Sequence, residues 1–349
     1  MPKEESKMIR YIEQKKIDYE KLDKILSESH SSNQFTNLGP AKRKLELKLE
    51  EMLEINQDKC VVCVSNGTLA LHAIYLHLKE KKIKWVSPSF TFPSCCVGNY
   101  DCDIVDIDKN YSISLSEKIL EQYDGFVITN LFGTYPSNIQ DWIYECRKKN
   151  KILVFDNASS PLTKIEGINF CNLGNFSFGS LHHTKFLGFG EGGFLVCDKQ
   201  MYMEMNRICG FGFQRVNGER IFQNNSSNFK MSDIAAASIL QHIEQFDILK
   251  YISNQHYLVE NLANLKNAKL FNYSDGVVYG NLPILFNYEI STSFFIEREI
   301  EAQKYYKPIK DFHNSIDLYK KIINFPLNQS LTKGEMEHII NVIKIADKK

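Results

Sequence analysis

The sequence has neither an excess of one charge nor a long hydrophobic run. Its 349 residues include 42 Lys and Arg and 42 Asp and Glu, so the formal net charge is zero. No overall field therefore attracts nucleic acid or a membrane surface, and we expect neither as a partner. No apolar run approaches the roughly 20 residues that a membrane-spanning helix needs. Residues 1–20 are charged throughout and lack the apolar stretch of a signal peptide, which favours a cytoplasmic location.

The cysteines do not form a recognisable disulfide or metal pattern. There are nine, an odd number, and they are scattered through apolar segments, as is typical of reduced and buried thiols. The one Cys-x-x-Cys pair, Cys60 and Cys63, lies in a run of β-branched residues. In a strand this spacing points the two side chains to opposite faces, which argues against a redox or zinc site.

Alternating strand-like and helix-like segments predict an α/β fold. The strand candidates in the first half of the chain are residues 60–65, 84–87, 103–107, 125–129 and 151–155. Helix-like segments separate several of them, notably residues 68–79 and 139–149. This alternation favours a mainly parallel sheet that helices cover on both faces.

The chain is longer than a single core usually grows, so we expect a large domain and a smaller one. Two more strand candidates, at 174–179 and 193–198, precede a long helical region that Ser232 caps and that extends toward Leu262. Irregular strands and a last helix follow, and this helix begins with a capping box from Thr332 to Glu335. The predicted parts are a helical lead-in, a large domain, and a linking helix with a small α+β domain, at residues 1–34, 35–247 and 248–349.

Ligands bind at the carboxyl ends of the strands in open parallel sheets, so chemically useful residues are expected there. Residues 65–68, Ser-Asn-Gly-Thr, join a strand to a helix whose N-terminus suits a phosphate, although a plain turn has the same pattern. Asp156 ends a strand and is a candidate helix cap, metal ligand or charge partner. Phe92 also follows a strand, and its ring either stacks on a planar heterocycle or packs in the core.

A Gly-rich segment at 176–193 carries the densest group of candidates. Gly188, Gly190 and Gly193 match Gly-x-Gly-x-x-Gly, but a strand follows these glycines where a dinucleotide-binding motif needs a helix. No Gly-Lys-Ser/Thr follows either, so a P-loop is excluded. Lys185 precedes the glycines and is either a solvated loop residue or a reactive amine. The second alternative requires burial, because burial lowers the pKa of an amine and makes it a nucleophile.

Two adjacent histidines, His182 and His183, lie just before this lysine. Adjacent histidines rarely bind one metal ion without further ligands nearby, and the surrounding sequence supplies none. We therefore predict no bound metal.

Together these motifs resemble the DegT/StrS group of nucleotide-sugar aminotransferases. The similarity extends from Phe35 almost to the C-terminus, with the motifs in the order of that family. They are Phe-Thr-Asn-Leu-Gly-Pro (35–40), Ser-Asn-Gly-Thr (65–68), Pro-Ser-Phe-Thr-Phe (88–92), Phe-Asp-Asn-Ala-Ser-Ser (155–160), Ser-Leu-His-His-Thr-Lys (180–185), Gly-Glu-Gly-Gly (190–193), Asn-Phe-Lys-Met-Ser-Asp (228–233) and Asn-Phe-Pro-Leu (324–327). The resemblance implies the aspartate aminotransferase-like fold, known as fold type I, with pyridoxal 5′-phosphate as cofactor and pyridoxamine 5′-phosphate as its intermediate form.

The resemblance also assigns roles, residue by residue. It implies that Lys185 forms the Schiff base with the cofactor and that Asp156 pairs with the pyridine nitrogen. It places Phe92 against the ring, and it assigns phosphate binding to Gly67, Thr68, Ser180 and an Asn228 from the neighbouring subunit, which implies a homodimer. The chain departs from the family at two positions: Ser159 stands where Gln or His usually contacts the ring, and Asn130 where many members have His.

The resemblance further implies a donor and an acceptor. The donor is L-glutamate, and the acceptor is a UDP- or dTDP-linked keto-sugar. Residues 180–193 look most similar to members that act at C-4 of a 4-keto-6-deoxyhexose and make a 4-amino-4,6-dideoxyglucose (viosamine) nucleotide. Members that act at C-3 share much of the pattern.

Two other functions remain open from the sequence. Related sugar dehydratases have His in place of the Schiff-base lysine, so the presence of Lys185 argues against that reaction. A catalytically silent binding or regulatory protein on the same fold is the alternative from another class, because fold alone does not determine function.

Overall fold

The computed structural model describes residues 8–98 and 100–348. Its largest sheet has seven strands in the order β1-β9-β8-β5-β4-β2-β3. They are β1 (Lys59–Val64), β2 (Trp85–Pro88), β3 (Cys102–Val105), β4 (Gly125–Thr129), β5 (Ile152–Asp156), β8 (Phe176–Ser180) and β9 (Gly193–Asp198). All pairs from β8 to β3 are parallel, whereas β9 is antiparallel to both of its neighbours. This mainly parallel sheet confirms the predicted α/β class.

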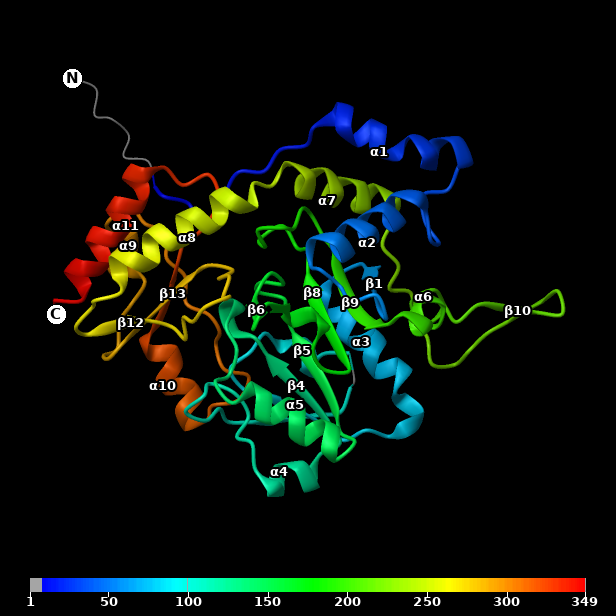
Figure 1. Cartoon of the computed structure of the whole chain (residues 1–349), viewed down its shortest axis with the longest axis horizontal. Helices are drawn as coiled ribbons and strands as arrows, with labels where there is room; N and C mark the ends of the chain where they lie inside the picture. Colours follow the sequence, from blue (N-terminus) through cyan, green and yellow to red (C-terminus); the bar gives the residue numbers. More distant parts are fainter. Residues whose placement is uncertain (1–7, 99, 349) are drawn as a thin grey trace.

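Helices pack on both faces of the sheet (Figure 1). α3 (Gly67–His77) and α6 (Tyr202–Cys209) share one core with Cys60 of β1, whereas α2 (Pro40–Met52) and α7 (Asp233–Gln245) share the opposite core with Cys63. The two cysteines therefore face opposite sides, as their spacing predicts, and all nine cysteines are free. α4 (Glu117–Gln122) and α5 (Ile139–Lys148) form a third core against β4 and β5.

The helical region after Ser232 is divided into two helices. The Ser232 hydroxyl accepts from the Ala235 N–H and begins α7, as predicted. The helix ends at Gln245, and Asp247 caps a new helix, α8 (Ile248–Leu262), by accepting from the Lys250 N–H. α8 leads to the C-terminal part of the molecule (Figure 1).

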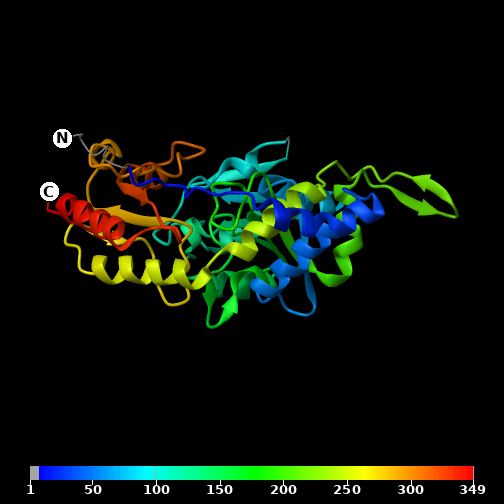
Figure 2. The same cartoon turned by 90° about the horizontal axis from the view of Figure 1, so that it is seen from above.

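The C-terminal part has its own antiparallel sheet, in the order β12-β13-β14. Its elements are β12 (Ala268–Leu270), β13 (Leu282–Phe286), α9 (Ser293–Ile296), α10 (His313–Lys321), β14 (Ile322–Phe325) and α11 (Lys333–Ala346). The predicted capping box is present, since Thr332 and Glu335 each accept from the other's backbone N–H at the start of α11. Figure 2 shows this part at the end of the molecule opposite to the β10–β11 hairpin, of Gln214–Val216 and Glu219–Ile221.

The N-terminal lead-in is helical only over α1 (Tyr19–Ser32), so the prediction of a helical segment over 1–34 is wrong for residues 8–18. The start of α1 is defined by Asp18, whose side chain accepts from the Lys21 N–H. Before it the chain is extended, because Ile9 pairs in parallel with Ile300 of the C-terminal part. Residues 1–7 of the prediction lie outside the described residues.

Two hairpins lie outside the two larger sheets. One hairpin, of β6 (Lys164–Ile165) and β7 (Ile168–Asn169), follows β5 in the chain. The β10–β11 hairpin projects from the large sheet (Figures 1 and 2). Over the described ranges, none of the helices is both long enough and apolar enough to cross a membrane.

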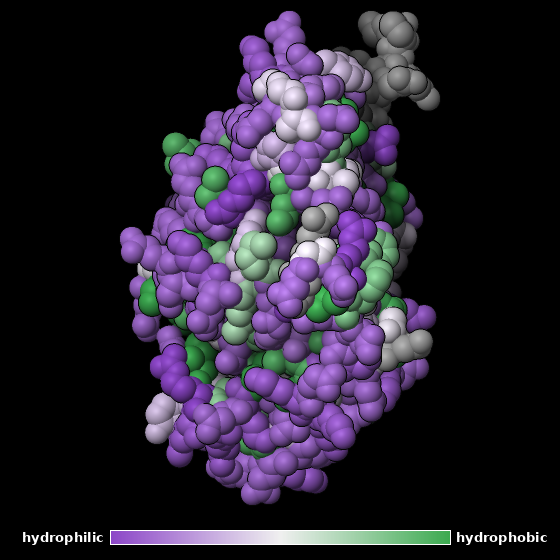
Figure 3. Space-filling model, turned by 90° about the vertical axis from the view of Figure 1, so that its right-hand side faces the viewer, coloured by the Kyte–Doolittle hydropathy of each residue, from purple (hydrophilic) through white to green (hydrophobic). Residues whose placement is uncertain are grey.

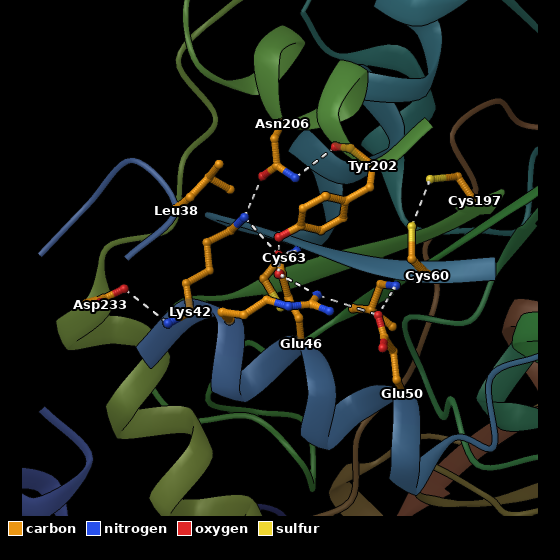
Figure 4. A network of polar contacts seen from close by, with 12 residues as sticks. Leu38, Lys42, Glu46, Glu50, Cys60, Cys63, Cys197, Tyr202, Asn206 and Asp233 are labelled. Atoms are coloured by element: carbon orange, nitrogen blue, oxygen red, sulfur yellow. Dashed lines mark hydrogen bonds and ion pairs between the residues drawn. The ribbon is translucent and has the colours of Figure 1, made fainter. Parts of the chain in front are cut away.

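Two carboxylates of α2, one of them fully buried, protect the free edge of β1. The Glu46 carboxylate accepts from the Cys63 N–H at 3.0 Å, and that of Glu50 accepts from the Val61 N–H at 3.1 Å (Figure 4). Lys42 forms an ion pair with Glu46 at 2.8 Å. Both edge N–H groups thereby have acceptors, which blocks pairing with another strand. This arrangement also holds β1 in place, and β1 leads directly into the turn before Gly67.

Candidate active site

The site lies where the carboxyl ends of several parallel strands meet. Asp156 ends β5, Thr129 ends β4, and Ser180 ends β8. Gly67, at the start of α3, follows β1 at the same edge, and Lys185 lies in the loop between β8 and β9. The sheet therefore brings together residues that are far apart in the sequence, as expected for this class of fold.

The first turn of α3 and the end of β8 form an anion cradle. Asn66 caps α3, and its side chain accepts from the Leu69 N–H at 3.0 Å. A Cβ atom added to Gly67 would lie 3.3 Å from the Ser180 Cβ, so the helix start directly abuts Ser180. The first N–H groups of a helix have no carbonyl partner within it. Asn66 accepts from the Leu69 N–H, which leaves the N–H groups of Gly67 and Thr68 for a ligand, and Thr68 and the adjacent Ser180 each add a hydroxyl. These groups can hold a phosphate.

Close packing against β9 shapes this cradle. A Cβ atom on Gly193 would lie only 2.2 Å from the backbone carbonyl carbon of Asn66. Real Cβ atoms do not approach backbone so closely, so any larger residue at Gly193 would displace the turn before α3. The glycine therefore sets how near the cradle lies to the Lys185 loop.

Asp156 is a buried acid, with 4% of its surface exposed. Its Oδ1 atom accepts from the Ala158 N–H at 2.9 Å, which forms a local turn, and no helix begins there for it to cap. Burial raises the pKa of Asp156 from 3.8 to about 6, and this backbone hydrogen bond and the positive charge of Lys185 oppose the rise. The acid is thus held ready to pair with a cation in the site.

Lys185 lies in a tightly folded loop. Its backbone N–H donates to the carbonyl of His182, and its own carbonyl accepts from the Gly188 N–H, both at 2.8 Å. A Cβ atom on Gly188 would lie 2.0 Å from the His182 carbonyl oxygen, so only glycine fits that turn. Burial lowers the pKa of the Lys185 amine, and the charge of Asp156 opposes this effect. The pKa of each group thus responds to the charge of the other, which means that both belong to one site.

Two further aromatic residues concern the site, the predicted Phe92 and one that the structure adds. Phe92 is 55% exposed, so it does not pack in the core, and a flat ligand can reach its ring. The sequence did not identify Tyr306, which comes from the C-terminal part and stacks on Phe132 with ring centroids 5.8 Å apart. Burial raises the pKa of the Tyr306 phenol, and the charge of Asp156 raises it further. No motif in the tail marked this tyrosine, because its role depends on the approach of the two parts of the chain.

Asn130, one of the two departures from the family pattern, lies directly beside Asp156. Its backbone N–H donates to the Asp156 carbonyl at 3.0 Å. Its side-chain amide donates to the Asn157 side chain. The Asn130 side chain thus buttresses the strand end that carries Asp156.

Ser159 and Asn228 lie at the margins of the site. Ser159 is buried, and a Cβ atom on Gly280 would lie 2.6 Å from its Oγ atom, so the serine packs against the C-terminal part. Asn228 is exposed and pairs with Gly210 near the base of the β10–β11 hairpin. The ring contact of Ser159 and the cross-subunit role of Asn228 stay predictions.

The histidines near Lys185 make local contacts. His182 Nδ1 lies 2.9 Å from the Thr184 hydroxyl oxygen, and its Nε2 atom lies 3.4 Å from the Glu191 carboxylate. Within residues 8–98 and 100–348, no three His, Cys, Asp or Glu side chains gather in a way that could hold a metal ion.

The fold is that of the pyridoxal-phosphate-dependent aminotransferases. A solved aminotransferase of Bacillus cereus that is described as PLP-dependent superposes with a TM-score of 0.83 at 23% identity, covering 97% of this chain and 100% of that one. PseC of Helicobacter pylori, an aminotransferase involved in pseudoaminic acid biosynthesis, gives 0.82 at 17% identity, over 98% and 100% of the two chains. These likenesses confirm the predicted architecture.

The family follows from the sequence as a whole. The model of the DegT/DnrJ/EryC1/StrS aminotransferase family matches residues 16–344, and the chain belongs to this family. A curated relative, the dTDP-4-amino-4,6-dideoxy-D-glucose transaminase of Shigella dysenteriae, is 26% identical over 347 residues, which is 90% of this chain and 92% of the relative. The chain is therefore an aminotransferase that uses pyridoxal 5′-phosphate, as the motifs predicted.

The residues present fit that cofactor. A phosphate needs N–H and hydroxyl donors, which the first turn of α3 and Ser180 provide. An aldehyde needs an amine whose pKa is lowered, as that of Lys185 is. A protonated ring nitrogen needs a carboxylate, and the buried Asp156 supplies one.

Proposed function

We propose that the enzyme moves an amino group from L-glutamate to C-4 of a UDP- or dTDP-linked 4-keto-6-deoxyglucose, making the 4-amino-4,6-dideoxyglucose nucleotide. The observation that carries this proposal is the buried pair of Lys185 and Asp156 beside the anion cradle. The name of the Shigella relative supports a dTDP-sugar and the C-4 position. Glutamate leaves as its keto acid and the sugar ketone becomes an amine, so the exchange needs no outside oxidant or reductant.

Lys185 and Asp156 divide the chemistry between them. When bound, the cofactor withdraws electrons from the donor's α-carbon and makes its C–H proton acidic. Lys185, as an amine whose pKa burial lowers, accepts this proton and later delivers it as an acid. Asp156 is ionised above about pH 6, and as a carboxylate it would accept a hydrogen bond from the protonated ring nitrogen and so keep that nitrogen cationic.

Other residues bind and orient. Gly67, Thr68 and Ser180 would hold the phosphate, and Phe92, which is exposed, would stack on the ring. Ser159 would contact the ring from the position where relatives have Gln or His. Each of these roles can be tested by substitution.

A second copy of the chain completes the site. We propose a homodimer in which Asn228 reaches the neighbouring cradle, because Asn228 is exposed and lies at the base of the projecting hairpin. Phe222, on that hairpin, is 67% exposed, and hydrophobic patches lie among hydrophilic residues on the face that carries the hairpin (Figure 3). Such exposed rings are common in protein interfaces.

We also propose the domain division and location that the sequence predicts. The cofactor-binding domain would be residues 35–247, and the linking helix and small domain would be residues 248–349, since the break at Phe246 separates α7 from α8. The enzyme would act in the cytoplasm, where sugar nucleotides and reduced thiols coexist.

Product analysis tests the function. The purified enzyme with cofactor is incubated with glutamate and each of the UDP- and dTDP-linked 4-keto and 3-keto sugars, and products are identified by mass. An amine formed only from 4-keto sugars supports the proposal, and one formed only from 3-keto sugars replaces it with the C-3 activity. If the protein remains colourless with added cofactor and is unchanged by glutamate, it is a binding protein instead.

A further inference from the structure

The extended segment before α1 reaches the loop that carries Lys185. This segment, residues 9–18, is here called the strap, and it runs from the C-terminal sheet to α1 (Figures 1 and 2). Lys15 of the strap donates from its Nζ atom to the carbonyl oxygens of His183 at 2.9 Å, Lys185 at 2.6 Å and Gly188 at 2.6 Å. An ammonium group has three N–H donors, so Lys15 uses each of them on this one loop.

The contact holds the part of the loop that determines where the Lys185 amine can reach. The Lys185 carbonyl belongs to the residue itself, and the carbonyls of His183 and Gly188 lie on either side of it. Hydrogen bonds from a charged donor are roughly twice as strong as those between neutral groups. The Lys15 side chain is half-buried, and burial lowers its pKa to about 8, so it is still mainly charged at neutral pH.

The strap is anchored on both sides of this contact. The Ile9 N–H donates to the Glu299 carbonyl at 2.8 Å. The Asp18 N–H donates to the side-chain oxygen of Gln241 in α7 at 2.9 Å. Because both ends of the strap are attached, the backbone of Lys15 is held at a set distance from the loop.

We propose that Lys15 is a positioning residue for Lys185: it clamps the backbone of residues 183–188 and so sets the orientation of the reactive amine. The proposal rests on the proposed role of Lys185 for its catalytic consequence, but the clamp itself is a property of the protein with or without cofactor. A misplacement of about 1 Å at a reacting group can cost roughly 100-fold in rate.

Lys15→Met tests the clamp, with Lys16→Met as the matched control because the Lys16 side chain is exposed. Hydrogen–deuterium exchange is measured over residues 182–190 of the full-length protein, without and with cofactor. Lys15→Met should speed exchange of the Lys185 and Gly188 N–H groups, which hydrogen-bond within this loop. Lys16→Met should exchange like the wild type.

The second readout is the cofactor itself. Lys15→Met should still bind it, but the pH midpoint of its visible absorbance band should shift, and kcat should fall roughly 10- to 100-fold with a smaller change in KM. Lys15→Gln, which retains two N–H donors, should lie between Lys15→Met and wild type. It also serves as the test if Lys15→Met does not fold.

Wild-type exchange and an unshifted band in both Lys15 variants would overturn the proposal. Loss of catalysis with unchanged loop exchange would also overturn it, since Lys15 would then act in another way. Failure of the proposed function can be told apart from failure of the clamp. An active Lys185→Ala enzyme would refute the role of Lys185 but would not change the hydrogen–deuterium exchange measured for the Lys15 variants.

Discussion

Replacing Asp156 by Asn should make the cofactor-free protein more stable at neutral pH while it destroys catalysis. In the folded protein burial holds the pKa of Asp156 at about 6, against 3.8 for an unperturbed aspartate. Since one pKa unit corresponds to about 1.4 kcal/mol, the ionised carboxylate costs the fold about 3 kcal/mol. Asn has nearly the same shape, can still accept from the Ala158 N–H, and carries no charge.

The difference in stability between Asp156→Asn and the wild type should depend on pH. Between pH 3.8 and about 6 the folded protein keeps the Asp156 proton that the unfolded chain has lost. Folding stability that depends on this group therefore falls as pH rises through that range and is lowest above pH 6. The advantage of Asp156→Asn should be about 1 kcal/mol near pH 4.5 and should approach about 3 kcal/mol at pH 7.5 as an upper limit. This value already includes the attraction of Lys185, which opposes the rise in the pKa of Asp156.

Urea unfolding of the cofactor-free proteins between pH 4.5 and 8 measures the difference. Asp156→Ala serves as a second variant, since it removes the charge but also leaves a small cavity. Added pyridoxal 5′-phosphate should reverse the order, because it should stabilise the wild type more than Asp156→Asn. If the cofactor-free Asn variant is less stable at pH 7.5, or if its advantage does not change with pH, burial of an ionised Asp156 is not the cause.

Three further outcomes follow from the site and its support. Lys185→Ala should abolish amine transfer, measured as product formed from glutamate and a keto-sugar nucleotide, and near-normal turnover would show that another group moves the proton. Glu46→Ala should lower the free energy of unfolding by about 3–5 kcal/mol, because it leaves the buried Lys42 charge without its partner. The control, Glu51→Ala on the exposed face of α2, should change this free energy by less than about 1 kcal/mol. Equal effects of the two substitutions in urea unfolding would contradict the buried network. Gly188→Ala should weaken cofactor binding by at least roughly 10-fold, since its Cβ would lie 2.0 Å from a backbone oxygen. An unchanged dissociation constant for the cofactor, measured by absorbance titration, would mean that the loop can relax.

Local sequence patterns were sufficient to predict many of the helices and strands. The β-branched runs, the caps at Ser232 and Thr332 and the strand–helix alternation each predicted an observed element, because they depend on neighbouring residues. The pattern was insufficient for residues 8–18. Their extended form depends on pairing with Ile300, which lies about 290 residues further along the chain.

The sequence by itself determined the fold class, the family, the enzyme class and the cofactor, because these are carried by short motifs at the ends of strands and by their order. It also marked Lys185 and Asp156 as the candidates for chemistry. Only the tertiary structure showed that burial shifts the pKa values of both in opposite senses, since desolvation is set by everything that packs around a group.

Two residues around that pair were visible only in the folded chain. Tyr306 arrives from the C-terminal part, and Lys15 reaches the Lys185 carbonyl across a separation of 170 residues. Neither lies in a motif, because a contact over such a distance imposes no pattern on the residues beside it in sequence. The motifs therefore identified the reactive groups, and the packing of distant segments decided how those groups are held.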